Sequence, residues 1–151
     1  MDLEIEILDR LYSVNENFIA RTSQELRRAQ RYLDFVSFLS VDASHIKESE
    51  LNETNPNGEF YRKLRRHIRN AIRQTDVISG FSKGKICVLL VDTPGEGVKS
   101  VSDRLQESIR YFLHEIINSP RHWRVEIHSD SFPGDGSTAN TFLSKIRAFL
   151  D

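Results

Sequence analysis

Residues 73–93 read RQTDVISGFSKGKICVLLVDT, and this stretch decides the fold expected for the chain. Two apolar, strand-like runs, DVISGF at 76–81 and KICVLLV at 85–91, are separated by Ser82 to Gly84. Strands joined by so short a segment are typical of a β-hairpin, and glycine adopts the left-handed backbone that tight turns need. We therefore predict a hairpin with Gly84 in its turn.

Three elements are expected before the hairpin. Residues 3–33 carry apolar side chains at three- and four-residue steps, which predicts one helix, or two helices broken near residues 13–17. FVSFLSVD at 35–42 is typical of a buried strand, and it ends on the acidic Asp42. Residues 60–73 return to the helical period, with apolar residues on one face and arginines on the other.

Three more elements are expected after the hairpin. A helix should follow the TPGEG segment at 93–97, and Trp123, Val125 and Ile127 alternate as in a strand. A last helix should begin at a Ser137 cap. The resulting order is helix, strand, helix, hairpin, helix, strand, helix. It predicts an α/β (α+β) sandwich with a ferredoxin-like central sheet and helices covering it.

Length and composition restrict the classes of function. The chain has 151 residues, 21 basic and 22 acidic groups and a formal charge of −1, which suits one globular domain but no general nucleic-acid binder. It lacks a long apolar run and a basic, apolar N-terminus, so we expect a cytoplasmic protein with no membrane contact. The single cysteine, Cys87, excludes an internal disulfide and is expected to be inert core. The five histidines show no metal-ligand spacing, so we expect neither a metal site nor a cofactor.

The 73–93 stretch resembles the GGDEF family of diguanylate cyclases, whose pattern is RxxD, five residues, GG[DE]EF and an apolar strand ending near Asp-Thr. VDASHIK at 41–47 is similar to that family's I-D-x-D-H-F-K strand end. SFPGDGSTANTFLSKIRAFL at 131–150 is similar to its closing segment. The resemblance runs from about Phe18 to Leu150 and implies a nucleotidyl-cyclase-like fold.

The resemblance implies that residues needed for cyclase activity are missing from this chain. The family's signature is replaced here by Ser82, Lys83, Gly84, Lys85 and Ile86. Of the two acids that hold metal in the family, Asp42 matches the first, whereas Gly84 takes the place of the second. Two Mg²⁺ ions need anionic oxygen ligands, so we expect no cyclase activity unless a partner chain completes the site. Asp42 has the simpler interpretation of a turn carboxylate at a strand end.

A second family site is retained in the pattern. Arg73 and Asp76 form RxxD at the family's spacing, which the resemblance implies is an inhibitory site for cyclic di-GMP. Arg104 falls where the family supplies a further arginine. A guanidinium can bond the O6/N7 edge of guanine, and a carboxylate can accept from guanine's opposite edge.

Each of these residues also has a structural interpretation. Asp76 can cap the strand entry and pair with Arg73, and Arg73 at a helix C-terminus is favoured by the helix dipole. The basic face of the 60–73 helix can be a solvated surface or a patch for an acidic partner.

We expect two parts in the chain: a helical extension at 1–17, whose apolar residues could form a dimer seam, and a degenerate GGDEF-like domain at 18–151. The expected function is that of a catalytically inactive cyclic di-GMP receptor or regulatory module in bacterial signalling, acting as a homodimer. The alternative is a ligand-free scaffold of the same fold that serves dimerisation or binds a partner protein.

Overall fold

The computed structural model describes residues 3–46, 59–116, 125–133 and 138–150. Four strands form one sheet in the order β2-β3-β1-β4, and every neighbouring pair is antiparallel. They are β1 (Val36–Asp42), β2 (Val77–Ile78), β3 (Lys85–Val91) and β4 (Glu126–Phe132). The edges of the sheet are thus the short β2 and the polar β4.

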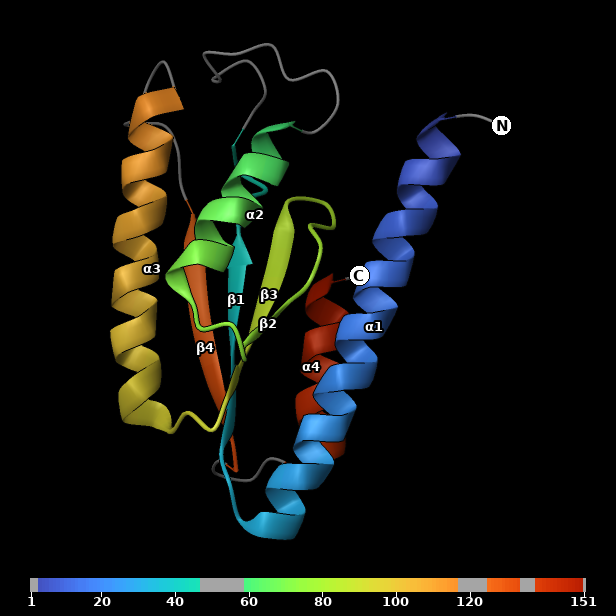
Figure 1. The fold of residues 1–151 in the computed structure, drawn as a ribbon, viewed down its shortest axis with the longest axis vertical. Helices are drawn as coiled ribbons and strands as arrows, with labels where there is room; N and C mark the ends of the chain where they lie inside the picture. The colour runs from blue at the N-terminus through green and yellow to red at the C-terminus, as the bar shows by residue number, and fades with distance from the viewer. Residues whose placement is uncertain (1–2, 47–58, 117–124, 134–137, 151) are drawn as a thin grey trace.

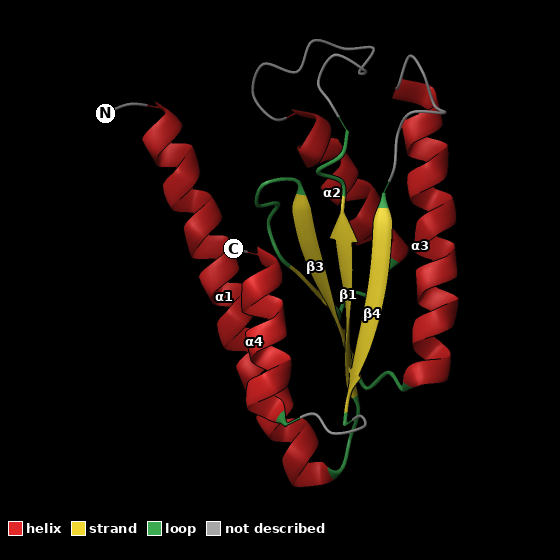
Figure 2. Cartoon of the chain, turned by 180° about the vertical axis from the view of Figure 1, so that it is seen from behind, coloured by secondary structure: helices red, strands yellow, loops and turns green. Residues whose placement is uncertain are grey.

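Helices cover both faces of this sheet. They are α1 (Leu3–Tyr32), α2 (Glu59–Ala71), α3 (Gly95–Ile116) and α4 (Ala139–Leu150). Figure 1 and Figure 2 show α2 and α3 on one face and α1 with α4 on the other, so the molecule has three layers. The run β1-α2-β2-β3-α3-β4 is the ferredoxin-like order, with α1 added before it and α4 after it. The predicted fold class is confirmed.

Two hydrophobic cores explain why the central strands read as continuous apolar runs. Leu39 and Val41 of β1 pack with α2 and α3, whereas Phe38 packs against Phe142 of α4 with ring centroids 4.9 Å apart. A strand covered by helices on both faces buries successive side chains alternately in each core. The central strands β1 and β3 therefore hold the two helical layers in one unit.

The predicted hairpin is present, but its first strand is shorter than expected. Only Val77–Ile78 forms β2. At the next residue, Ser79, a side-chain hydroxyl takes the place of the backbone carbonyl as the acceptor for β3. Cys87 N–H donates to the Ser79 hydroxyl at 2.9 Å, and Ser79 N–H donates to the Cys87 carbonyl at 2.9 Å. The Cys87 side chain is fully buried, and this burial raises the pKa of its thiol, as expected of an inert core residue.

Of the two possibilities for residues 3–33, the structure has the single helix: α1 is continuous over 30 residues, with no break near residues 13–17. Polar residues there suggested an interruption, but one of them makes a tertiary contact from within the helix. The Asn15 side-chain carbonyl accepts a hydrogen bond of 3.0 Å from Gly80 N–H, in the segment after β2. The same helix crosses the boundary expected between residues 17 and 18.

The last strand and helix begin slightly later than predicted. Val125 precedes β4, and Trp123 and Ser137 lie outside the described residues. The cap observed on α4 is Thr138, whose hydroxyl accepts a hydrogen bond of 3.1 Å from Thr141 N–H.

Candidate functional site

The hairpin turn lies directly against the loop that follows β1. Ser82 and Lys85 exchange both backbone hydrogen bonds, at 2.8 and 2.9 Å, around Lys83 with φ of 52° and Gly84 with φ of 80°. Two successive positive φ values are characteristic of the tight type I′ hairpin. Gly84 accepts a hydrogen bond of 2.8 Å from Ala43 N–H, and a Cβ atom at position 84 would lie 2.7 Å from Ser44 Cα. An acidic side chain therefore has no room at position 84 in this conformation.

Asp42 closes the end of β1 as a turn carboxylate. Its Oδ1 accepts hydrogen bonds from Ser44 N–H at 2.9 Å and from the Ser44 hydroxyl at 2.6 Å. Partial burial disfavours the charge of the Asp42 carboxyl, but the Ser44 hydrogen bonds and nearby His45 and Lys85 outweigh it and lower its pKa. Asp42 and Gly84 together do not fit the two-carboxylate metal centre that the resemblance implies.

Asp76 is a buried hydrogen-bond acceptor at the junction of α2, β2 and β3. Its residue is 3% exposed, and its carboxylate accepts from Arg73 N–H at 3.0 Å and Val91 N–H at 3.2 Å. Arg73 Nη2 lies 3.2 Å from Asp76 Oδ1, so the two RxxD side chains form an ion pair. Arg73 Nη2 also donates to Thr93 Oγ1 at 2.7 Å. The pair thus links the end of α2 to the end of β3.

Arg104, on α3, has a different hydrogen-bond partner. Its Nε donates to the Ala71 carbonyl at 3.1 Å, which satisfies a backbone acceptor at the C-terminus of α2. The structure thus places Arg104 beside the segment that leads to Arg73, two residues after Ala71, but this hydrogen bond joins it to neither Arg73 nor Asp76.

An open cleft of about 590 Å³ lies over the RxxD segment. One wall consists of residues 73–77 with Val91 and Asp92, and the other consists of Arg21, Glu25 and Arg28 of α1. The side chains of Arg21, Arg28 and Arg73 are 51%, 41% and 54% exposed. Three half-exposed guanidinium groups therefore border one concave surface.

Sequence reasoning missed the α1 wall of this cleft. Glu25 pairs with Arg21 at 3.2 Å and with Arg28 at 3.1 Å, and Arg28 reaches Asp92 at 2.9 Å. The spacing of three and four residues among these charges was a signal for a shared helix face. Nothing in the sequence showed that this face lies against the end of β3.

A group of metal-ligating side chains was also missed, at the opposite end of β1 from the cleft's Val91 wall. Asp42 and Glu126 are direct cross-strand neighbours on β1 and β4. With His45 from the turn after β1, each offers a ligand atom, and these atoms lie within 4.8 Å of one another.

Comparison with known sequences gives a distant relative. No family model matches the chain. The uncharacterized membrane protein YdaK of Bacillus subtilis (strain 168) is 25% identical over 127 residues, which cover 82% of this chain and 44% of YdaK. The chain thus spans less than half the length of that curated relative. Within the described residues, no helix is both long and apolar enough to cross a membrane, and the cytoplasmic location stays a prediction.

Comparison with solved structures is more informative. The GGDEF domain of YfiN (TpbB) from Pseudomonas aeruginosa superposes with a TM-score of 0.71 at 18% identity, covering 88% of this chain and 84% of that one. The active GGEEF domain of a diguanylate cyclase from Vibrio cholerae gives 0.66 at 13% identity, covering 88% and 89%. The fold is that of a GGDEF domain. The arrangement of helices and sheet in this GGDEF-like chain is thus similar to that of these domains, although the sequence identity is below 20%.

The P. aeruginosa diguanylate cyclase SiaD, solved in complex with its activator SiaC, has the same fold, with a TM-score of 0.67 at 15% identity. The superposition covers 89% of this GGDEF-like chain and 52% of SiaD.

Proposed function

We propose that this GGDEF-like domain is a catalytically inactive receptor for cyclic di-GMP in bacterial signalling. The observation that carries the proposal is the cleft over the RxxD segment, bordered by Arg21, Arg28 and Arg73. Its volume of about 590 Å³ lies within the range of small-molecule sites, about 300–1,000 Å³. The three arginines supply donors for the phosphates and a base of such a ligand, although each is also paired with an acid of the cleft.

The residues divide the recognition of such a ligand between them. Arg73, half-exposed on the wall formed by residues 73–77, can donate to the O6 and N7 acceptors of a guanine. Arg21 and Arg28 on the facing wall suit the two phosphates, because a planar guanidinium donates to phosphate oxygens in a bidentate fashion. The purine can stack between these walls.

In this proposal, Asp76 is a positioning residue. Its side chain is 1% exposed and already accepts from Arg73 and from Val91 N–H. A direct bond to guanine would require the carboxylate to give up these donors, so its main role is to hold Arg73 toward the cleft. Arg104 has a supporting role at the end of α2, through its bond to Ala71.

The absence of cyclase activity is the second half of the proposal. It is supported by Gly84 at the position of the second acid and by the close approach of the turn to Ser44. Incubation of the purified chain with GTP and Mg²⁺ or Mn²⁺ should yield no cyclic dinucleotide. Turnover by the purified chain would reject this part.

Calorimetric titration with cyclic di-GMP tests the receptor role. Arg73→Ala should weaken binding by about 1–3 kcal/mol, the scale of one lost bidentate guanine contact. Arg66→Ala is the matched control, because Arg66 is an exposed arginine of α2 that does not line the cleft. Arg104→Ala should have a smaller effect than Arg73→Ala. Equal affinities of wild type and Arg73→Ala would reject the site.

A ligand-free scaffold is the alternative, and one observation favours it. Arg73 and Asp76 already satisfy each other, so the motif is stable without a ligand. The fold also serves in a complex of a cyclase with its activator protein, that of SiaD with SiaC. This alternative predicts no heat of binding at micromolar cyclic di-GMP.

A further inference from the structure

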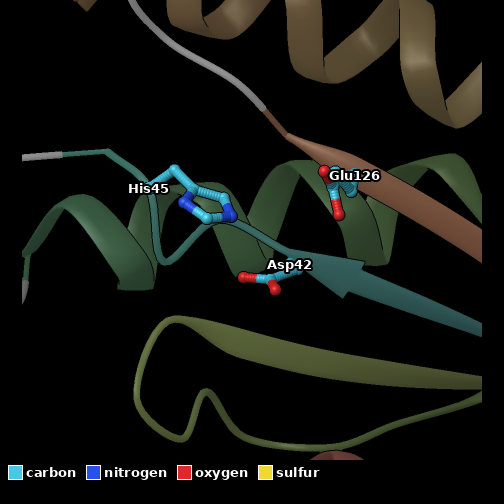
Figure 3. Close-up of side chains that lie close together, drawn as sticks. All are labelled: Asp42, His45 and Glu126. Atoms are coloured by element: carbon cyan, nitrogen blue, oxygen red, sulfur yellow. The ribbon is translucent and has the colours of Figure 1, made fainter.

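Three side chains of different chemistry meet where β1 ends and β4 begins. Asp42 is the last residue of β1, Glu126 is the first residue of β4, and the two are paired across the strands. His45 lies in the turn three residues after Asp42. Figure 3 shows the carboxylates and the imidazole grouped around this strand end. Their ligand atoms lie within 4.8 Å of one another.

We propose that Asp42, His45 and Glu126 bind one divalent first-row transition-metal ion, with Zn²⁺ as the best match. Two carboxylate oxygens and one imidazole nitrogen form a mixed set of the kind found around such ions. Imidazole disfavours Mg²⁺ and Ca²⁺, which take oxygen ligands almost exclusively. This pairing differs from the one that the GGDEF resemblance implies, because the second acid comes from β4 and a histidine joins it.

The geometry needs only side-chain adjustment to close around an ion. Ligand atoms about 2.0–2.2 Å from zinc lie about 3–4 Å from one another, slightly closer than the 4.8 Å limit found here. Asp42 and Glu126 are half-buried, while His45 is exposed and free to change rotamer. The backbones of Asp42 and Glu126 are already held next to each other by the pairing of β1 with β4.

The surroundings favour a cation at this point. Ser44 donates two hydrogen bonds to Asp42 Oδ1 and so orients the carboxylate, as outer residues do around metal ligands. Lys85, the cross-strand neighbour of Asp42 on β3, places its ammonium over the Phe149 ring, 5.6 Å from the centroid. Two carboxylates and one imidazole are therefore gathered at the strand end.

A bound ion would first of all hold the edge strand β4 against β1. Among the described strands, β4 is hydrogen-bonded to β1 alone, so a metal that joins Asp42 to Glu126 would strengthen that contact. Three protein ligands leave at least one coordination position for water or an external ligand. This site is separate from the RxxD cleft, and neither proposal depends on the other.

The test is calorimetric titration of the chelator-treated chain with ZnCl₂, followed by titration with MgCl₂. We expect one Zn²⁺ per chain, a higher melting temperature with Zn²⁺, and no heat from Mg²⁺. His45→Gln and Glu126→Gln should each weaken Zn²⁺ binding by about tenfold or more. His45 is exposed and Glu126 is half-buried, so the melting temperature of each metal-free variant is measured as the reference for its own shift with Zn²⁺.

His128→Gln is the matched control. His128 Nε2 lies 3.9 Å from Glu126 Oε2, but this ring is not one of the three ligands. The proposal is overturned if Zn²⁺ does not bind, if His45→Gln binds it as tightly as wild type, or if His128→Gln loses more affinity than His45→Gln. Retained cyclic di-GMP binding in the His45→Gln variant would show that the cleft is unaffected.

Discussion

Gly84 illustrates how one residue determines whether the hairpin can close. Its φ of 80° is accessible to glycine at little cost, and an added Cβ would approach the backbone of Ser44 to 2.7 Å. Gly84→Ala should therefore destabilise the fold by about 1–3 kcal/mol, from a strained backbone and a displaced loop. Urea unfolding measures this change.

Lys83 provides the control for that prediction. It also has a positive φ, of 52°, in the same turn. Lys83→Gly should be neutral or slightly stabilising, because glycine relieves the strain of a side chain in the left-handed region. If Gly84→Ala is as stable as Lys83→Gly, the close approach to Ser44 has no energetic importance.

Asp42 predicts a specific dependence of stability on pH. Its pKa is lowered in the folded chain, whereas in the unfolded chain a carboxyl titrates near its ordinary value of about 3.9. In the folded chain, the Asp42 carboxyl is therefore protonated only at lower pH than in the unfolded chain. The stability that its charged form contributes is fully present above about pH 4 and is lost as the pH falls through the folded-state pKa. Asp42→Asn should reduce the loss of stability between about pH 5 and pH 2, measured by urea unfolding with chelator present.

At the scale of elements, α1 has one part that packs on the domain and one part that projects from it. Asn15 is bonded to Gly80, and residues from Phe18 onward enter the core, while the N-terminal turns stand apart from the rest of the molecule in Figure 1 and Figure 2. Apolar residues occur in that projecting part at positions 3, 5, 7, 8 and 11. We expect these apolar residues to pair with those of another copy of the chain, as in a coiled coil.

Removal of residues 1–12 should consequently lower the oligomeric state without unfolding the domain. Multi-angle light scattering measures the mass, and circular dichroism checks that the fold remains. A monomer both before and after truncation would show that α1 is not a dimer seam.

The elements also show how far sequence reasoning reached. β1 and β3 were predicted within a residue because they are buried on both faces, which gives an unambiguous apolar run. The possible break in α1 is not present, because the polar side chain of Asn15 makes a tertiary contact instead of capping a helix. β4 was displaced because an edge strand reading EIHSDSF has little apolar pattern. The RxxD pair could be found from spacing, whereas Arg28 and Glu126 could not, since their partners are 64 and 84 residues away in the chain.

At the scale of the whole molecule, the cleft lies where two layers meet. Its α1 wall belongs to one helical layer, and its other wall includes the turn between α2 and β2 at the sheet edge. The ion pair between Arg28 and Asp92, at 2.9 Å, joins the two sides, and exposed pairs of this kind contribute only about 0–1 kcal/mol. A ligand that binds both walls would therefore add substantially to the connection between α1 and the sheet.

Hydrogen exchange tests this consequence of ligand binding. Saturating cyclic di-GMP should slow amide exchange in residues 21–28 of α1 and in residues 73–77, because binding to the folded state opposes local opening. Exchange in α3 near Tyr111, which lies away from the cleft wall, should be unchanged and serves as the internal control. Arg73→Ala should abolish the protection at ligand concentrations that saturate wild type. Slowing confined to residues 73–77 would show that α1 takes no part in the site, and uniform slowing across α3 would point to ligand bound elsewhere.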